Sequence, residues 1–163
     1  MNRYLIALGS NQRHVRFGSP VAILRAALAE LGAQGLLVEA ASSIMRSRPV
    51  GPSQREYANG AAVVQTDLEP PELLDLLQNI ENAFGRRRQG QRWRSRTLDL
   101  DIVMWTGGGW ADDRLTIPHA EFRKRDFVLR PAAQIAPGWR DPLTVLTVKH
   151  LFSRLTRRAS APR

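Results

Sequence analysis

The clearest candidate for a functional site in this sequence is a pair of aspartates separated by one leucine, Asp99 and Asp101. An apolar run at residues 102–105 follows them, which is typical of a buried strand. On a strand, both carboxylates point to the same face, with their Cα atoms about 7 Å apart. Like charges this close repel unless a cation lies between them or each has a basic partner. The pair is therefore a candidate Mg²⁺ site, since Mg²⁺ binds one or two carboxylates together with substrate phosphates. Two exposed acids paired with arginines are the alternative.

Six arginines lie immediately upstream, between residues 86 and 96. The planar arginine fork is the side chain best shaped to hold a phosphate group. Because anionic substrates and cations commonly bind together, these arginines favour a metal at the aspartates and indicate phosphoryl chemistry on a nucleotide. A solvated basic loop is the alternative, since such a charge run requires no ligand.

Polar and aromatic residues elsewhere suggest ligand contacts of a weaker kind. Tyr57 and Asn59 occupy alternate positions of a predicted strand and share a face, and an amide can read the edge of a heterocycle. Trp93 lies among the arginines, where it could stack on a base or anchor the loop. His119 is followed by the basic run 123–125, which suggests a phosphate contact. Taken alone, the pair Tyr57 and Asn59 is better explained by ordinary sheet packing, and a lone histidine is more commonly structural or exposed.

Composition limits the class of protein. The 163 residues fit one domain, 1–163, with 43% hydrophobic and 24% charged residues, as in a soluble globular protein. There is no cysteine, no apolar run long enough to cross a bilayer and no signal-peptide pattern, so we expect a cytoplasmic protein. The net charge of +9, almost all from arginine, favours an anionic partner.

The elements that must position these residues follow from hydrophobic periodicity and from turn and cap signals. Strands are predicted at residues 3–8, 36–45, 57–65 and 99–105, helices from Ser19-Pro20 to Gly32 and from Pro70-Pro71 to Gly85, and loops at 46–56 and 86–94. This order, β-α-β-β-α-β, predicts an α+β ferredoxin-like antiparallel sheet with helices on one face. A C-terminal extension follows, with patterns at 115–118 and 127–135, a helix near 145–155 and a tail expected to fray from about residue 154.

Several motifs in fixed order resemble the 6-hydroxymethyl-7,8-dihydropterin pyrophosphokinase family of folate biosynthesis. They are Leu8-Gly9-Ser10-Asn11, Pro49-Val50-Gly51-Pro52 before Tyr57-x-Asn59, Gln78-x-Ile80-Glu81, Gly85-Arg86, Arg92-Trp93-x-x-Arg96-Thr97-Leu98-Asp99-Leu100-Asp101, Leu115-Thr116-Ile117-Pro118-His119 and Arg125-x-Phe127.

The resemblance implies a reaction and its cofactors. Diphosphate would pass from ATP, the co-substrate, to the pterin hydroxymethyl group with release of AMP. Asp99 and Asp101 would bind two Mg²⁺ ions, while Arg86 and Arg96 would be the catalytic arginines that steady charge on the transferred group.

The resemblance also implies the ligand contacts. ATP would be bound by Gln78, Glu81, Arg88, Arg92, Arg114, Thr116, His119 and Arg125. The pterin would be bound by Ser47, Val50, Tyr57, Asn59, Trp93 and Phe127. We expect a monomer whose partners are ATP and hydroxymethyldihydropterin, without a nucleic-acid or membrane partner.

The chain departs from the family pattern at Arg48, at Arg94-Ser95 and at Ala120, where an aromatic residue is common. An RNA-binding module of the same topology is the alternative function, favoured by the net charge. Such modules stack bases on aromatic side chains of the central strands, and residues 58–65 contain none. A metal-binding structural domain without activity would leave the arginines unused.

Overall fold

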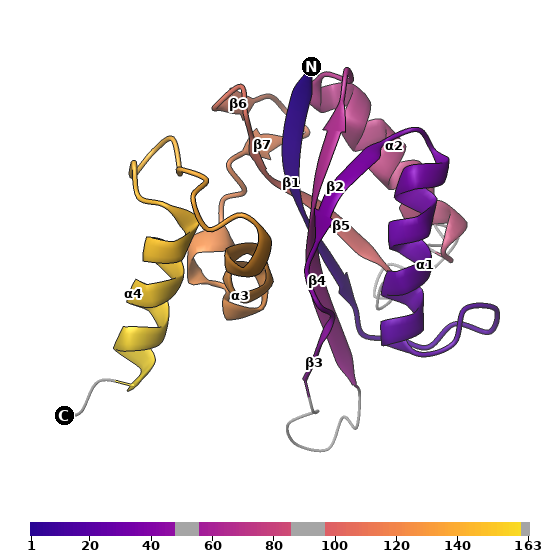
Figure 1. The fold of residues 1–163 in the computed structure, drawn as a ribbon. Helices are drawn as coiled ribbons and strands as arrows, with labels where there is room; N and C mark the ends of the chain where they lie inside the picture. Colours follow the sequence, from indigo (N-terminus) through magenta and orange to yellow (C-terminus); the bar gives the residue numbers. More distant parts are fainter. Residues whose placement is uncertain (48–55, 86–96, 161–163) are drawn as a thin grey trace.

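The computed structural model of the chain describes residues 1–47, 56–85 and 97–160 (Figure 1). Its elements are β1 (Asn2–Ser10), α1 (Pro20–Ala33), β2 (Leu37–Ala41), β3 (Met45–Ser47), β4 (Tyr57–Thr66), α2 (Pro70–Ala83), β5 (Asp99–Trp105), β6 (Trp110–Ala111), β7 (Thr116–Ile117), the 3-10 turn η2 (Phe122–Lys124), α3 (Asp126–Ile135) and α4 (Val148–Ser160).

The main sheet has the order β2-β4-β1-β5, and every neighbouring pair is antiparallel. The short strand β3 also pairs with β4, beyond the end of β2 (Figure 1). Strand β4 therefore lies between β1 and β2, and β1 lies between β4 and β5, so helices α1 and α2 provide the crossovers. This is the predicted ferredoxin-like arrangement.

Local sequence signals start and end the two crossover helices. The hydroxyl of Ser19 accepts a hydrogen bond from the Ala22 amide at 3.2 Å and caps α1, as its position before Pro20 predicted. Gly32 does not end this helix, which continues to Ala33, and Gly35 follows in the left-handed region with φ 97°. In α2, the side chains of Glu69 and Glu72 form a reciprocal capping box.

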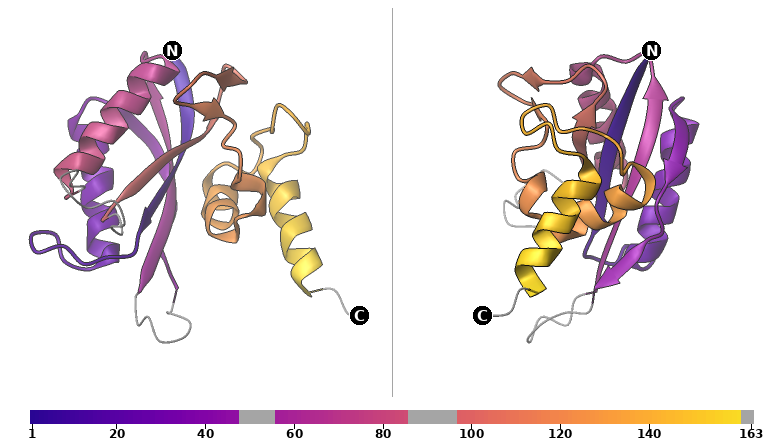
Figure 2. Two further views of the ribbon diagram at one scale, coloured as in Figure 1. Left: turned by 180° about the vertical axis from the view of Figure 1, so that it is seen from behind. Right: turned by 60° about the vertical axis from the view of Figure 1, so that its left-hand side comes forward.

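Both faces of the sheet are covered, which makes three layers (Figure 2). Helices α1 and α2 pack on one face, where Tyr4, Ile6 and Leu8 of β1 enter a fully buried core. Helix α3 packs on the opposite face, where Leu5 contacts a second core, and α4 packs against α3 on its outer side (Figure 1). The C-terminal extension is therefore the third layer of the domain, because the apolar residues on that face of the sheet would otherwise meet water.

The strand predicted at 36–45 is divided in two. Strand β2 ends at Ala41, and β3 begins at Met45. Between them, the buried Ser42 hydroxyl accepts the Ala61 amide at 2.9 Å, and the Ser43 amide donates to Gln134 of α3. Side chains thus replace part of the strand ladder. The loop predicted at 46–56 was wrong at its start, since residues 46 and 47 belong to β3.

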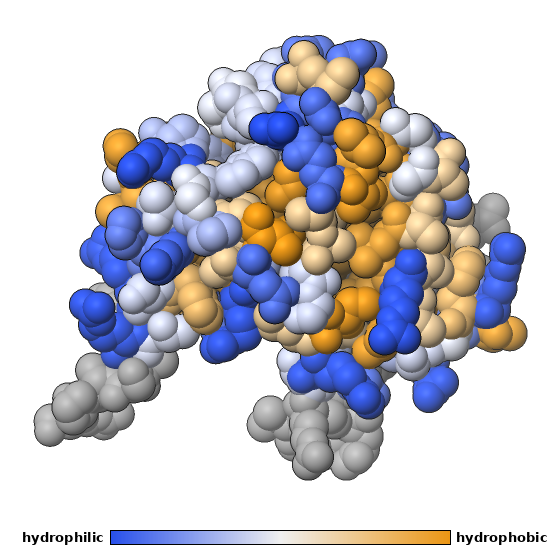
Figure 3. All heavy atoms as spheres, in the orientation of Figure 1, coloured by the Kyte–Doolittle hydropathy of each residue, from blue (hydrophilic) through white to orange (hydrophobic). Residues whose placement is uncertain are grey.

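The prediction that the tail frays from residue 154 was wrong for residues 154–160, because α4 continues to Ser160. This helix is amphipathic. Leu151 is buried in the second core, with Phe152 and Leu155 packed against it, while Lys149 and Arg154 are exposed. In Figure 3, hydrophilic residues dominate the outer side of α4, and apolar residues gather toward the sheet. No helix within the described ranges has the length and apolarity needed to cross a membrane.

Candidate active site

A cleft of about 370 Å³ opens at the edge of the sheet, where α2 and β7 lie beside β5. Five of the predicted ATP residues, Glu81 included, line this cleft together with the metal candidate Asp101. The lining residues are Leu74, Gln78, Glu81, Leu100, Asp101, Ile102, Arg114, Leu115, Thr116, His119 and Ala120. With Glu81, the cleft brings together five predicted ATP contacts from two segments far apart in sequence.

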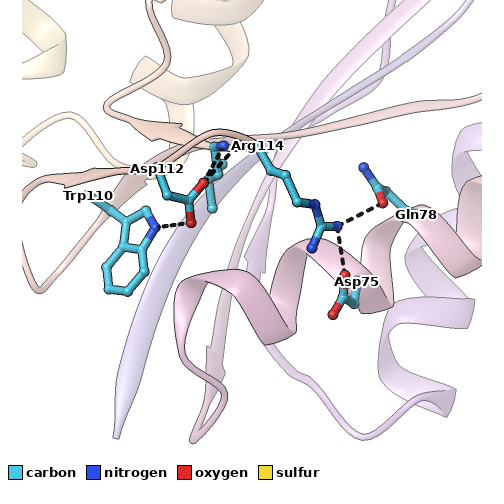
Figure 4. Close-up of polar contacts among 6 residues, drawn as sticks. Asp75, Gln78, Trp110, Asp112 and Arg114 are labelled. Atoms are coloured by element: carbon cyan, nitrogen blue, oxygen red, sulfur yellow. Dashed lines mark hydrogen bonds and ion pairs between the residues drawn. The ribbon is translucent and has the colours of Figure 1, made fainter.

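Arg114 crosses from the β6–β7 connection to helix α2 (Figure 4). Its Nη2 atom donates to Asp75 Oδ1 at 2.7 Å and to Gln78 Oε1 at 3.2 Å. The bond to Gln78 also orients the amide of that side chain, whose oxygen faces Arg114. The cleft therefore has a polar end at which one guanidinium and one amide have fixed orientations.

Asp112 organises the turn that carries Arg114 (Figure 4). It accepts hydrogen bonds from the Trp110 indole at 2.9 Å and from the backbone amides of Arg114 and Leu115, both at 2.8 Å. The indole bond, followed by these amide bonds, lowers the pKa of Asp112 below its ordinary value. A carboxylate that stays ionised thus fixes the backbone of the residues that line the cleft.

His119 lies at the β5 side of the cleft with a defined tautomer. Its backbone amide donates to the Val103 carbonyl at 3.0 Å, and its Nδ1 accepts from the Glu121 amide at 3.1 Å. Because Nδ1 is an acceptor, the neutral ring carries its proton on Nε2. His119 can therefore donate a hydrogen bond through Nε2 to an anionic ligand.

Glu81 connects helix α2 to the edge of the sheet. Its side chain is 4% exposed, and its Oε2 accepts the Leu100 amide at 2.8 Å. This bond satisfies a backbone donor of edge strand β5 between the two aspartates. Glu81 therefore supports the backbone around Asp99 and Asp101, in addition to lining the cleft.

The paired aspartates share a sheet face, as their spacing predicted. Leu100 and Ile102 enter the core beneath α1 and α2, so Asp99 and Asp101 point to the face that carries α3. In the sheet register, Gly9 pairs with Asp99 on one side and with Asn59 on the other. Asn59, Gly9 and Asp99 therefore form one row across three strands, about 10 Å from end to end.

The other predicted pterin contacts in the described residues come from two segments. Ser47 pairs with Tyr57 at the end of the β3–β4 ladder, and Tyr57 is 40% exposed. Phe127, at the start of α3, is 47% exposed, and the Arg125 guanidinium lies 5.7 Å from the centre of its ring. Arg125 does not line the cleft that holds the other described ATP candidates.

Six candidates lie outside the described residues. They are Val50, Arg86, Arg88, Arg92, Trp93 and Arg96. Their assignments remain predictions from the sequence.

The donor set can be tested against the expected Mg²⁺. Within the described ranges, no group of three or more histidine, cysteine, aspartate or glutamate side chains is arranged to hold a metal. Two carboxylates on one strand face suit an ion that completes its coordination with substrate phosphates and water, because Mg²⁺ is commonly bound that way. Asp99 and Asp101 therefore fit a substrate-associated Mg²⁺.

Sequence reasoning missed residues that line the cleft and one that contacts a lining residue from outside it. Asp75 was not considered, although it precedes Gln78 by three positions and shares its helix face. The apolar walls supplied by Leu74 and Leu115 follow only from the packing of α2 against the β6–β7 connection.

The family model for 7,8-dihydro-6-hydroxymethylpterin-pyrophosphokinase (HPPK) matches residues 5–137. Two proteins named 2-amino-4-hydroxy-6-hydroxymethyldihydropteridine pyrophosphokinase are similar over most of their length. The protein from Synechocystis is 41% identical over 152 residues, covering 93% of this chain and 75% of the relative. The protein from Haemophilus influenzae is 43% identical over 133 residues, covering 80% and 79%.

The fold is also found in a solved structure, that of Plasmodium falciparum HPPK-DHPS. It aligns with a TM-score of 0.73 and 13% identity, covering 98% of this chain and 42% of that longer chain. At this identity, the likeness concerns the fold alone. The fold is α+β, and the family model and the two relatives place the sequence in the pyrophosphokinase class.

The chain belongs to the 7,8-dihydro-6-hydroxymethylpterin-pyrophosphokinase family. This confirms the predicted pyrophosphokinase of folate biosynthesis, with ATP as co-substrate, and gives no support to the RNA-binding alternative.

Proposed function

We propose that this protein transfers the β,γ-diphosphate of ATP to the hydroxymethyl group of 6-hydroxymethyl-7,8-dihydropterin. The hydroxymethyl oxygen would attack the β-phosphorus and lose its proton to solvent. The bond from the β-phosphorus to the oxygen shared with the α-phosphate would break. AMP would then leave with that oxygen.

ATP would bind in the cleft beside β5. Its base and ribose would lie toward Gln78, Arg114 and Thr116, and its triphosphate toward His119 and Asp101. The proton on His119 Nε2 supports this orientation, since it offers a hydrogen bond to a phosphate oxygen. Arg125, Arg88 and Arg92 would add positive charge around the triphosphate, and Glu81 would hold the β5 backbone.

The pterin would bind on the sheet face that carries α3. Asn59 would hydrogen-bond to its heterocyclic edge, and the exposed rings of Tyr57 and Phe127 would pack on its faces. Ser47, Val50 and Trp93 would complete this side. The small residues Gly9 and Ala7, which separate β4 from the aspartates of β5, leave space for a flat ring system.

Asp99 and Asp101 would hold two Mg²⁺ ions, which would supply positive charge to offset the charge of the phosphate oxygens. Arg86 and Arg96 would steady the charge of the transferred group. We further propose a cytoplasmic monomer, with one domain over residues 1–163, that acts on small molecules and has no nucleic-acid partner.

One observation carries the proposal. Two sequence segments bring Gln78, Arg114, Thr116 and His119 into a single cleft, and Asp101 lines the same cleft. The test is to incubate the protein with Mg²⁺, ATP and hydroxymethyldihydropterin and to separate the nucleotides by chromatography. We expect AMP and pterin diphosphate in equal amounts. Formation of ADP, or no reaction, would contradict the proposal.

A further inference from the structure

Asp75 holds Arg114 from outside the cleft. Arg114 lines the cleft, whereas Asp75 of α2 is not among the lining residues. Figure 4 shows the side chain of Arg114 reaching Asp75 on this helix. The ion pair measures 2.7 Å between Arg114 Nη2 and Asp75 Oδ1, and the two side chains are 51% and 60% exposed. Asp75 can therefore balance the charge of Arg114 without occupying ligand space.

The pair leaves part of Arg114 available to a ligand. Both side-chain bonds, to Asp75 and to Gln78, use Nη2. Among the described residues, Nε and Nη1 have no side-chain partner, so both can donate to a ligand from a guanidinium whose orientation is fixed from α2. A clamped arginine can thus donate to a neutral acceptor in the cleft while its charge is offset by the carboxylate next to it.

The distribution of charge within the cleft means that the Asp75–Arg114 ion pair affects which part of a nucleotide binds at the Arg114 end. In the part of the cleft formed by described residues, Arg114 is the only arginine or lysine. The neighbours Gln78 and Thr116 are uncharged. Glu81, Asp101 and His119 lie toward β5, where Glu81 accepts the Leu100 amide. Asp75 contacts the guanidinium of Arg114 directly, whereas the second nearby carboxylate, Asp112, binds the backbone amide of Arg114 and the Trp110 indole. With Asp75 in place, the guanidinium charge is offset, so this end suits the base and ribose rather than phosphate. Without that carboxylate, it would attract phosphate.

We propose that Asp75 is a specificity-determining residue, which neutralises and positions Arg114 so that this end of the cleft accepts the uncharged nucleoside part of the nucleotide. The inference rests on the proposed function. The contribution of Asp75 to folding is small, because half-exposed ion pairs stabilise proteins little. We therefore expect Asp75 to affect the relative affinities for a nucleoside and for phosphate more than it affects stability.

The test compares Asp75→Asn with the wild-type protein. Asparagine can still accept a hydrogen bond from Arg114 but carries no charge. We expect inorganic triphosphate to bind roughly two- to fivefold more tightly, and adenosine to bind more weakly by a similar factor, in line with the strength of exposed ion pairs. Calorimetry gives both dissociation constants, and Asp75→Glu should restore the wild-type ratio.

Asp67→Asn is the matched control, since it removes another exposed carboxylate just before α2 and changes the net charge by the same amount. It should leave the ratio of the two dissociation constants unchanged. An equal shift in both asparagine variants, or no shift in Asp75→Asn, overturns the inference. If the wild-type protein binds ATP but Asp75→Asn leaves the ratio of the triphosphate and adenosine dissociation constants unchanged, only this inference fails. If the wild-type protein does not bind ATP, the proposed function fails as well.

Discussion

Gly9 and Asn59 pair across β1 and β4 so closely that no side chain fits on Gly9 without displacing Asn59. A Cβ atom on Gly9 would lie 3.2 Å from Asn59 Nδ2. The backbone of Gly9 has no positive φ that would require a glycine. Glycine suits this position because the Asn59 side chain on the proposed pterin face lies so close, and not because the backbone needs the conformational freedom of glycine.

Gly9→Ala should consequently weaken pterin binding without unfolding the protein. The added methyl group would shift the Asn59 amide by a few tenths of an ångström and weaken its hydrogen bond to the pterin. We expect the KM for pterin to rise about three- to tenfold, the equivalent of one hydrogen bond, with the KM for ATP almost unchanged. Steady-state kinetics with each substrate varied in turn would measure this.

Gly60→Ala is a suitable control. A Cβ atom there would lie 3.5 Å from the Ser42 hydroxyl, which is an ordinary contact distance. This variant should keep the wild-type KM for pterin. Equal effects of the two substitutions would mean that strand packing, and not the position of Asn59, accounts for the change.

The aspartates of β5 allow a second prediction. Asp101→Asn should lower kcat by at least about a hundredfold, because it removes a proposed Mg²⁺ ligand at the cleft, and should raise the Mg²⁺ concentration needed for half-maximal rate. Asp113→Asn, an exposed acid outside the cleft, should leave both quantities unchanged. A near-normal rate in Asp101→Asn would exclude the metal assignment.

Periodicity and capping signals predicted the first part of the fold because short-range rules act there. Ser19 caps α1 as expected, and the alternation of Leu98, Asp99 and Leu100 gives the correct face of β5. The end of the C-terminal helix was harder to predict. Its basic composition indicated fraying, whereas the contacts of Leu151 and Phe152 with the second core, which depend on the whole fold, extend it to Ser160.

The candidate site was predictable in part for a similar reason. Motifs identified Gln78, Thr116 and His119 individually, but periodicity cannot place a helix beside a distant hairpin. The contact of Asp75 with Arg114 joins residues 39 positions apart and follows only from the packing of α2 near the β6–β7 connection. Interactions of this kind escape rules that consider one element at a time.

Val145 carries backbone strain that a single substitution should relieve. Its φ of 67° is unusual for a β-branched residue, and its side chain is 64% exposed, so little packing compensates. Val145→Asn should raise the free energy of unfolding by about 1 kcal/mol, because asparagine tolerates the left-handed region. Urea denaturation measures the change. Val145→Ala, which keeps an ordinary side chain on the same backbone, should gain less, and an equal gain would contradict the strain argument.

The buried ion pair between Arg123 and Asp141 predicts how stability depends on pH. Asp141 is fully buried and accepts hydrogen bonds from Arg123, from the Leu143 amide and from the Thr144 hydroxyl. Burial alone would raise its pKa, but these bonds outweigh burial and lower the pKa of Asp141 from 3.8 to about 2. The folded state therefore favours the ionised form.

Because the folded pKa lies below the unfolded one, the associated stability is fully present above about pH 4 and is lost as the pH falls toward 2. The shift corresponds to about 2 kcal/mol. Asp141→Asn should therefore be less stable than the wild-type protein by about 2 kcal/mol or more at pH 6, since Arg123 also loses its partner, and the difference should shrink at pH 3 and below. Urea denaturation at several pH values measures this.

Asp126→Asn, which breaks the exposed pair with Arg130, is the control and should cost less than about 1 kcal/mol of unfolding free energy at pH 6. A difference between Asp141→Asn and the wild-type protein that stays constant from pH 6 to pH 2 would show that the carboxylate charge of Asp141 does not stabilise the fold.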